Sequence, residues 1–158
     1  MRAYTYILFM FLFIHNITIA QEVNFDRSNL IIKTENEEYY FNVEVASTYE
    51  QRSQGLMHRK LLKQNDGMIF IYPKPQIVKM WMKNTYIPLD MIFIKENGEI
   101  DTIIKMTKPL QIKPLGPETL IKAVLEINGG LTTYLKINKG DIVISTDITG
   151  IYNDKKNN

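Results

Sequence analysis

The chain has 158 residues, a net charge of +2 from 19 Lys or Arg against 17 Asp or Glu, and no cysteine. This near balance of charge argues against nucleic-acid binding, which usually needs a basic stripe. The absence of cysteine excludes disulfides, an acylated cysteine anchor and the usual thiolate zinc sites.

The first 20 residues have the three-part layout of a secretory signal peptide. Arg2 supplies the positive start, an apolar run covers residues 4–14, and Ala20 offers a small-residue cleavage site. The run is shorter than the roughly 20 residues of a membrane-spanning helix. We therefore expect cleavage after Ala20, export to the periplasm or extracellular space, and no membrane span afterwards. An uncleaved anchor is the alternative.

Residues 21–150 have the length of a single domain, and the polar residues 151–158 are expected to form a disordered tail. Within the domain, strand patterns dominate. Tyr39, Phe41 and Val43 alternate with polar residues, and period two is typical of a half-buried strand. The ranges expected as strands are, in chain order, 29–33, 39–45, 68–72, 77–82, 89–95, 100–106, 120–127 and 142–146.

Two short helices are expected between these strands. The first has Ser47 as its N-cap, Glu50 as the capping-box partner and Gly55 as its end. The second covers residues 131–137, after a Gly-Gly turn. An Asn-Gly pair in residues 96–99 predicts a tight hairpin.

The overall fold follows from this pattern of elements. Residues 107–119 contain three prolines and are expected to form a long loop or flap. Many short strands with few helices predict an α+β fold: a mostly antiparallel, strongly bent sheet, arranged as a barrel-like sandwich, with two or three short helices.

Familiar catalytic motifs are missing from the sequence. It has no Gly-rich phosphate loop, no calcium loop of the Asp-x-Asp type and no Gly-x-Ser-x-Gly turn. Once the first 20 residues are removed, His58 is the one histidine, and its context is that of an exposed turn. We expect no metal and no cofactor.

Three segments nevertheless form a specific combination. They are Arg52-x-x-Gly-Leu-Met, Asp66-Gly-Met-Ile-Phe, and a longer segment that starts at Trp81 and reads Trp-Met-Lys-Asn-Thr-x-x-Pro-Leu-Asp. In this order and spacing they resemble DUF192, a family of unknown function, over about residues 40–147. The resemblance implies a compact α+β domain around a bent sheet, often exported in bacteria, and it implies no activity, substrate or cofactor.

Asp90 is a candidate functional residue because it lies inside an apolar strand, where a carboxylate is costly to bury without a partner. Arg52, Arg59 and Lys83 are the candidate cations. One hypothesis is an ion pair that ties the helix and a turn to the sheet. The other is a small polar pocket, in which Asp90 contacts a ligand.

The pocket hypothesis assigns roles to the surrounding side chains. Trp81 would form an apolar wall with Met57, Met68 and Met82, and Asn84 and Thr85 would cap the turn that leads to Asp90. The proposed ligand-binding residues are Arg52, Met57, Arg59, Trp81, Lys83, Asn84, Thr85 and Asp90.

Three kinds of function remain open from the sequence. The favoured hypothesis is an exported module that binds a small molecule or an envelope protein. The second is an envelope hydrolase that uses Asp90 with Glu126 or His58, since paired carboxylates can perform acid–base catalysis. The third is a structural or assembly factor whose sheet edge pairs with a partner strand.

Overall fold

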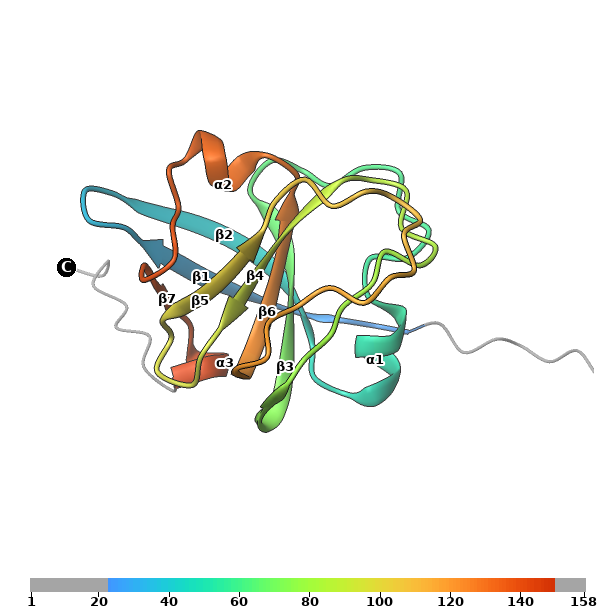
Figure 1. Ribbon diagram of the computed structural model, residues 1–158, viewed down its shortest axis with the longest axis horizontal. Coiled ribbons are helices and arrows are strands. Elements are labelled where there is room, and N and C mark those ends of the chain that lie inside the picture. The colour runs from blue at the N-terminus through green and yellow to red at the C-terminus, as the bar shows by residue number, and fades with distance from the viewer. Residues whose placement is uncertain (1–22, 150–158) are drawn as a thin grey trace, which may run out of the picture.

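The computed structural model describes residues 23–149, which form seven strands and three short helices around one sheet (Figure 1). The expected signal peptide and C-terminal tail lie outside the described residues. The strands are β1 (Asp26–Lys33), β2 (Glu38–Ala46), β3 (Asp66–Ile77), β4 (Leu89–Ile94), β5 (Ile100–Ile104), β6 (Leu120–Asn128) and β7 (Ile142–Ile144). The helices are α1 (Tyr49–Gln54), α2 (Leu131–Tyr134) and α3 (Thr146–Thr149).

The sheet has the strand order β5-β4-β6-β3-β2-β1-β7, and only the β2–β3 pair is parallel. Its two edges come back together. Glu99, just before β5, bridges to Ile142 in β7, and the N–H of Val143 donates to the carbonyl of Gly98 (2.8 Å). The sheet is therefore nearly closed into a barrel, which confirms the expected fold class. It also leaves little open edge for strand pairing with a partner.

The central strands are buried on both faces, as the burial of all six β4 residues illustrates. Ile92 and Leu125 belong to a cluster inside the barrel, which we call the inner cluster. Their chain neighbours Met91 and Val124 point the other way into an outer cluster. A sheet that covers a core on each side reads as continuous apolar sequence.

The outer cluster is covered by α1 and by two irregular segments, residues 78–88 and 105–117. β3 is longer than expected because it continues through two prolines to Ile77, with a shift of register between Ile71 and Gln76. Proline lacks the N–H that a sheet ladder needs, and it is tolerated at such an irregularity. The expected strand over 77–82 is wrong: beyond Ile77, the segment makes one isolated bridge and otherwise follows a loop.

The first helix begins one residue later than expected. Thr48, not Ser47, is the N-cap: its hydroxyl accepts from the N–H of Gln51 (3.2 Å), and the Gln51 side chain accepts from the N–H of Thr48 (3.0 Å). Gly55 ends the helix at φ 49°, as expected. The capping box therefore exists, with its members shifted by one position.

The hairpin between β4 and β5 also differs in detail. Gly98 has φ 85°, but Asn97 does not have a positive φ. The N–H of Gly98 donates to the carbonyl of Lys95 (3.0 Å), and the β4–β5 register shifts after Phe93. A turn that ends in one left-handed glycine, with a bulge, replaces the expected two-residue turn.

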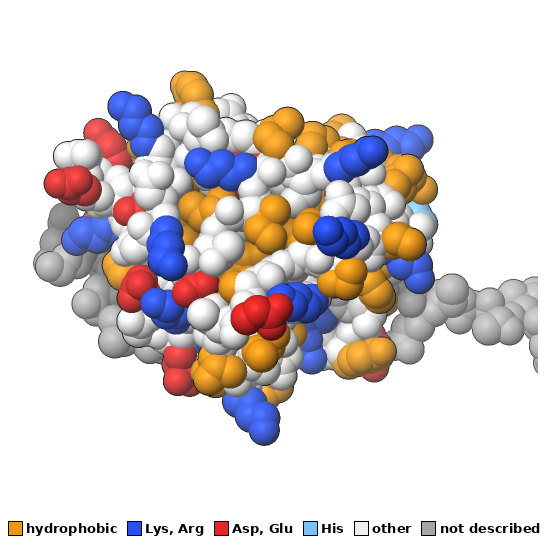
Figure 2. All heavy atoms as spheres, in the orientation of Figure 1, with side chains coloured by type: hydrophobic (Ala, Val, Ile, Leu, Met, Phe, Trp, Pro, Cys, Tyr) orange, Lys and Arg blue, Asp and Glu red, His pale blue; other side chains and the backbone are white. Residues whose placement is uncertain are grey.

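The remaining features concern the surface. No helix within residues 23–149 is long and apolar enough to cross a membrane. Large apolar side chains are nevertheless visible on the surface, most densely over the two irregular segments (Figure 2).

Candidate functional site

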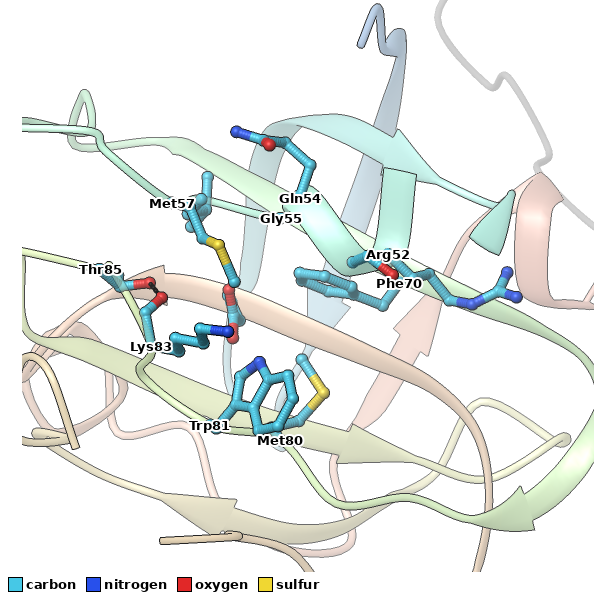
Figure 3. Close-up of a pocket in the computed structure, with 12 residues that line it drawn as sticks. Arg52, Gln54, Gly55, Met57, Phe70, Met80, Trp81, Lys83 and Thr85 are labelled. Atoms are coloured by element: carbon cyan, nitrogen blue, oxygen red, sulfur yellow. Dashed lines mark hydrogen bonds between the residues drawn. The ribbon is translucent and has the colours of Figure 1, made fainter. Parts of the chain in front are cut away.

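A shallow pocket with a cavity volume of about 30 Å³, open to solvent, lies between the end of α1 and the irregular segment 78–88 (Figure 3). Two parts of the chain, residues 52–57 and 80–85, supply its wall, and β3 and β6 supply its floor. The lining residues are Arg52, Ser53, Gln54, Gly55, Leu56, Met57, Phe70, Met80, Trp81, Lys83, Thr85 and Glu126.

The glycine after α1 allows the helix to sit close to the floor. Gly55 has a positive φ, and a Cβ added there would come within 3.1 Å of the Phe70 ring. The chain then turns back, so that Leu56 is buried and Met57 reaches the pocket. The Arg-x-x-Gly-Leu-Met segment is thus explained as a helix end shaped to pack on β3.

Glu126 is the polar group at the floor of the pocket. It is 4% exposed, and no described residue forms a hydrogen bond or an ion pair with its carboxyl group. Burial raises the pKa of Glu126 to about 8, because the charged form loses its hydration without gaining a partner. At pH 7 the group is therefore mostly protonated.

Trp81 and Lys83 form the opposite wall. Trp81 is 52% exposed, and the Lys83 ammonium lies 5.7 Å from the centre of its ring. The indole nitrogen and the ammonium both point toward the middle of the pocket, and Met57 approaches from the other side (Figure 3). Within the described residues neither group has a hydrogen-bond acceptor, so both are available to a ligand.

Arg52 lines the pocket, but its guanidinium is used elsewhere. It donates to the carbonyls of Ser47 and Ile71, the latter at 3.0 Å, and lies 5.3 Å from the centre of the Tyr72 ring. Figure 3 shows the guanidinium turned away from the pocket centre. Arg52 therefore joins α1 to β3 and contributes only its stem to the pocket.

Tyr72 lies beneath this arginine at the edge of the site. Its hydroxyl donates to the sulfur of Met80 (3.7 Å). Burial raises the pKa of Tyr72 to about 12; the charge of Arg52 opposes this effect and that of Glu126 adds to it. The hydroxyl thus stays protonated next to Met80, one of the pocket residues.

Asp90 is fully buried, as a sequence-based reading of its strand suggests, but its partners are not cations. Its Oδ1 accepts from the N–H groups of Met106 (2.7 Å) and Gly130 (2.9 Å), and its Oδ2 from the N–H and hydroxyl of Thr132 (2.9 and 2.6 Å). No Lys or Arg of the described residues lies within ion-pairing distance. The ion-pair hypothesis is therefore wrong. The Asp90 carboxyl group instead holds the start of α2 and the segment just after β5 onto β4.

The Asp90 side chain also does not line the pocket. In the β4–β6 pairing, Asp90 is opposite Ile127, whereas Glu126 is opposite Met91. Side chains of paired residues share a face, so the two acids lie on opposite faces of the sheet. The hypothesis that they form a catalytic carboxylate pair is wrong. His58 is exposed and is not a lining residue, as expected for a surface histidine.

The other expected site residues divide between the pocket and its surroundings. Thr85 is buried and lines the pocket. Both guanidinium nitrogens of Arg59 contact the carboxylate of Glu44, one of them at 2.9 Å. The side-chain amide of Asn84 contacts the sulfur of Met57 (3.9 Å). Neither lines the pocket.

The expected apolar wall is also changed in part. Met68 and Met82 are fully buried in the outer cluster and do not reach the cavity. Their places are taken by Met80 and Phe70. Sequence reasoning thus brings together five residues that do line the pocket, Arg52, Met57, Trp81, Lys83 and Thr85.

Glu126 is the main residue that sequence reasoning left out of the site. The signal was present, because Glu126, like Asp90, is a single acid in an apolar strand. What singles it out is the register of β6 against β3, which turns it toward the pocket. No group of three or more His, Asp or Glu among residues 23–149 is placed to hold a metal ion.

Comparison with known proteins extends these observations. No curated protein matches the chain. A structure from Sinorhizobium meliloti 1021, described as a candidate transcription regulator, is 34% identical, with a TM-score of 0.78 over 80% of this chain and 99% of that one. A protein of unknown function from Novosphingobium aromaticivorans DSM 12444 is 33% identical, with a TM-score of 0.75 over 82% and 89% of the two chains.

The family expected from the sequence motifs also matches directly. The DUF192 family, described as an uncharacterized ACR, covers residues 30–145. That range contains every strand except the start of β1, and it contains all the pocket residues. The chain belongs to the DUF192 family.

Proposed function

We propose that this protein is an exported binding module whose pocket takes a small organic anion with an apolar body. The observation that carries the proposal is Glu126, a carboxyl group without a protein partner at the floor of an open pocket. Buried polar groups are normally hydrogen-bonded, and one that faces a cavity is a natural contact for a ligand.

The polar groups that face the cavity favour an anion. The Lys83 ammonium and the Trp81 indole N–H are donors only, and a protonated Glu126 can donate as well. A ligand with several acceptor oxygens, such as a carboxylate, matches all three. Phe70, Met57 and Met80 offer apolar contact to the rest of such a ligand.

Binding can be followed through Trp81, which is the one tryptophan of the chain. The full chain would be titrated with benzoate and octanoate, and with benzamide and octanamide as uncharged counterparts. We expect the acids to change Trp81 fluorescence and to bind best below pH 8. Above pH 8 an ionised Glu126 would repel them.

Two variants separate the contributions of the pocket. Lys83→Gln should weaken acid binding by roughly tenfold or more, the usual effect of losing a charged hydrogen bond. Glu126→Gln should keep binding and lose its pH dependence, because the amide stays neutral. Lys60→Gln, an exposed lysine outside the pocket, is the matched control. Equal binding of acids and amides, or no effect of Lys83→Gln, would contradict the proposal.

An acid–base enzyme is the second candidate, and the raised pKa of Glu126 is the observation that favours it. Such an enzyme would use Glu126 without Asp90 and His58, which lie outside the pocket. Mass spectrometry distinguishes the two functions when a ligand recovered from the native protein is incubated again with the purified protein. A binding module leaves the mass of the ligand unchanged, whereas an enzyme converts the ligand to a product of different mass.

The Sinorhizobium structure is described as a candidate transcription regulator, but the helices of this chain do not favour DNA binding. The three helices of the described residues span six, four and four residues. None resembles the recognition helix that many transcription regulators place in the DNA major groove. Binding of a small anion has more support in the geometry of the site.

Export rests on residues 1–20 and has its own test. Expression of the full chain in a bacterial host should yield a processed form in the periplasm or medium. N-terminal sequencing is expected to find Gln21 first. A cytoplasmic, unprocessed chain would contradict export while leaving the pocket proposal untouched.

A further inference from the structure

The two irregular segments, residues 78–88 and 105–117, run side by side and form one surface, which we call the loop face (Figure 1). Met80 and Leu115 exchange two backbone hydrogen bonds, of 2.7 and 2.8 Å, and others join the segments nearer β4 and β5. The loop face is therefore a defined part of the fold.

Large apolar side chains project from this surface. Each is between 49% and 71% exposed. They are Trp81, Tyr86, Met106, Leu110 and Ile112. Apolar groups that gather on one exposed surface usually mark a contact with another molecule.

The charges of the loop face all have one sign. Its two segments contain five lysines, no arginine and no Asp or Glu. Lys79 is held by Glu118 at 2.6 Å, but the other four, Lys83, Lys105, Lys108 and Lys113, form no ion pair with any described residue. Figure 2 shows Lys or Arg and hydrophobic side chains interspersed over this region.

We propose that the loop face docks the protein on a membrane surface that carries anionic lipid. Unpaired lysines beside exposed aliphatic and aromatic side chains suit such a surface, because the ammonium groups meet lipid phosphates while the apolar groups enter the headgroup region. Protein interfaces have the opposite preference, since they are enriched in Arg and depleted in Lys. The composition of the loop face thus favours a lipid surface over an acidic protein.

Trp81 reports on this docking directly. The full chain also carries the apolar run of residues 4–14, so sedimentation with vesicles would not isolate the loop face. Vesicles of phosphatidylcholine with and without phosphatidylglycerol would be tested, some with brominated acyl chains. We expect Trp81 fluorescence to shift to the blue and to be quenched only when phosphatidylglycerol is present, and high salt to reverse both effects.

A charge-reversal pair identifies the surface. Lys108→Glu with Lys113→Glu should weaken binding roughly 25-fold or more, from about fivefold for each lysine near an anionic surface. Both residues are exposed and lie outside the pocket, so the pocket proposal is not affected. Lys33→Glu with Lys74→Glu changes the net charge equally on β1 and β3 and should bind like the unmodified protein.

Three results would overturn the proposal. Trp81 could remain unquenched by brominated lipid while the protein sediments with vesicles, which would assign binding to another part of the chain. The two charge-reversal pairs could weaken binding equally, which would make net charge the cause. Polyglutamate could shift Trp81 fluorescence as strongly as the vesicles, which would assign the loop face to an acidic protein.

Discussion

A buried carboxyl group either receives enough hydrogen bonds to remain charged or holds its proton. Asp90 and Glu126, in adjacent strands, differ in the hydrogen bonds that their carboxyl groups receive. Asp90 receives four hydrogen bonds, three of them from backbone N–H groups. Glu126 receives none from the described residues, and burial raises its pKa to about 8. The first acid therefore has a structural role and the second is free to serve the pocket.

Glu126 should make stability depend on pH. Its pKa is near 4.5 when unfolded and about 8 when folded, so the folded state binds the extra proton between these values. The free energy of unfolding should then fall as pH rises from 4.5 to 8, by up to about 1.4 kcal/mol per pH unit. Urea unfolding across this range should show the decline in the native chain and not in Glu126→Gln, which would match it near pH 4 and exceed it near pH 9. Parallel profiles would contradict the assignment.

Removing the Asp90 carboxylate should damage the fold and not the pocket alone. Asp90→Ala leaves one buried and two partly buried N–H groups without acceptors, each at a cost of roughly 1–3 kcal/mol, so a loss of at least about 3 kcal/mol is expected by urea unfolding. Asp141→Ala, which removes one surface hydrogen bond to the N–H of Asn138, should cost about 1 kcal/mol or less. An Asp90→Ala protein that keeps its melting temperature and loses a ligand would instead restore the pocket hypothesis.

At the scale of elements, the pocket depends on how α1 is attached to the sheet. The helix has only six residues and no fully buried side chain. Its N-cap, its closing glycine and the Arg52 guanidinium bound to β3 therefore determine where it lies. A helix this short gains little from its own hydrogen bonds and relies on such attachments.

Two neighbouring residues distinguish the observed cap from the expected one. Thr48→Ala should lower the free energy of unfolding by about 1 kcal/mol, the usual cost of losing an N-cap side chain. Ser47→Ala removes only a 3.4 Å contact between the Ser47 hydroxyl and Gln51, and it should lower the free energy of unfolding by about 0.3 kcal/mol. Urea unfolding of both variants is the measurement, and the reverse order would return the cap to Ser47.

At the scale of the whole molecule, one sheet separates two apolar cores. The inner cluster fills the barrel, and the outer cluster lies under α1 and the loop face. The second core explains why long loops are well defined without regular secondary structure: they cover apolar surface that would otherwise face water. The same covering segments present the pocket and the loop face.

Adjacent residues on opposite faces of β4 test this two-core arrangement. Met91→Ala and Ile92→Ala should each lower the free energy of unfolding by about 2–5 kcal/mol, since both side chains are fully buried. Leu120→Ala, at a position that is 62% exposed, is the control and should change it by less than about 0.5 kcal/mol. A sheet with one wet face would tolerate Met91→Ala, and that outcome would contradict the second core.

Local chemistry is what the sequence by itself determined. Alternation and turn residues located all seven strands of the described residues, because period-two burial and turn preferences act over a few residues. They also predicted one strand, over residues 77–82, that the structure does not have. The spaced motifs identified the family. Five pocket residues were also predicted, although the reason for choosing them was wrong: they were expected to surround Asp90, which lies on the other face of the sheet.

Only the tertiary structure decided which distant groups meet. The donors that bind Asp90 lie 16 to 42 residues away, and nothing local distinguishes them from the cations first considered. The face to which Glu126 points likewise depends on register, and a slip of one residue would place it with Asp90. Strand pairing is a property of the whole sheet, so the roles of these two acids could be assigned only once the sheet was known.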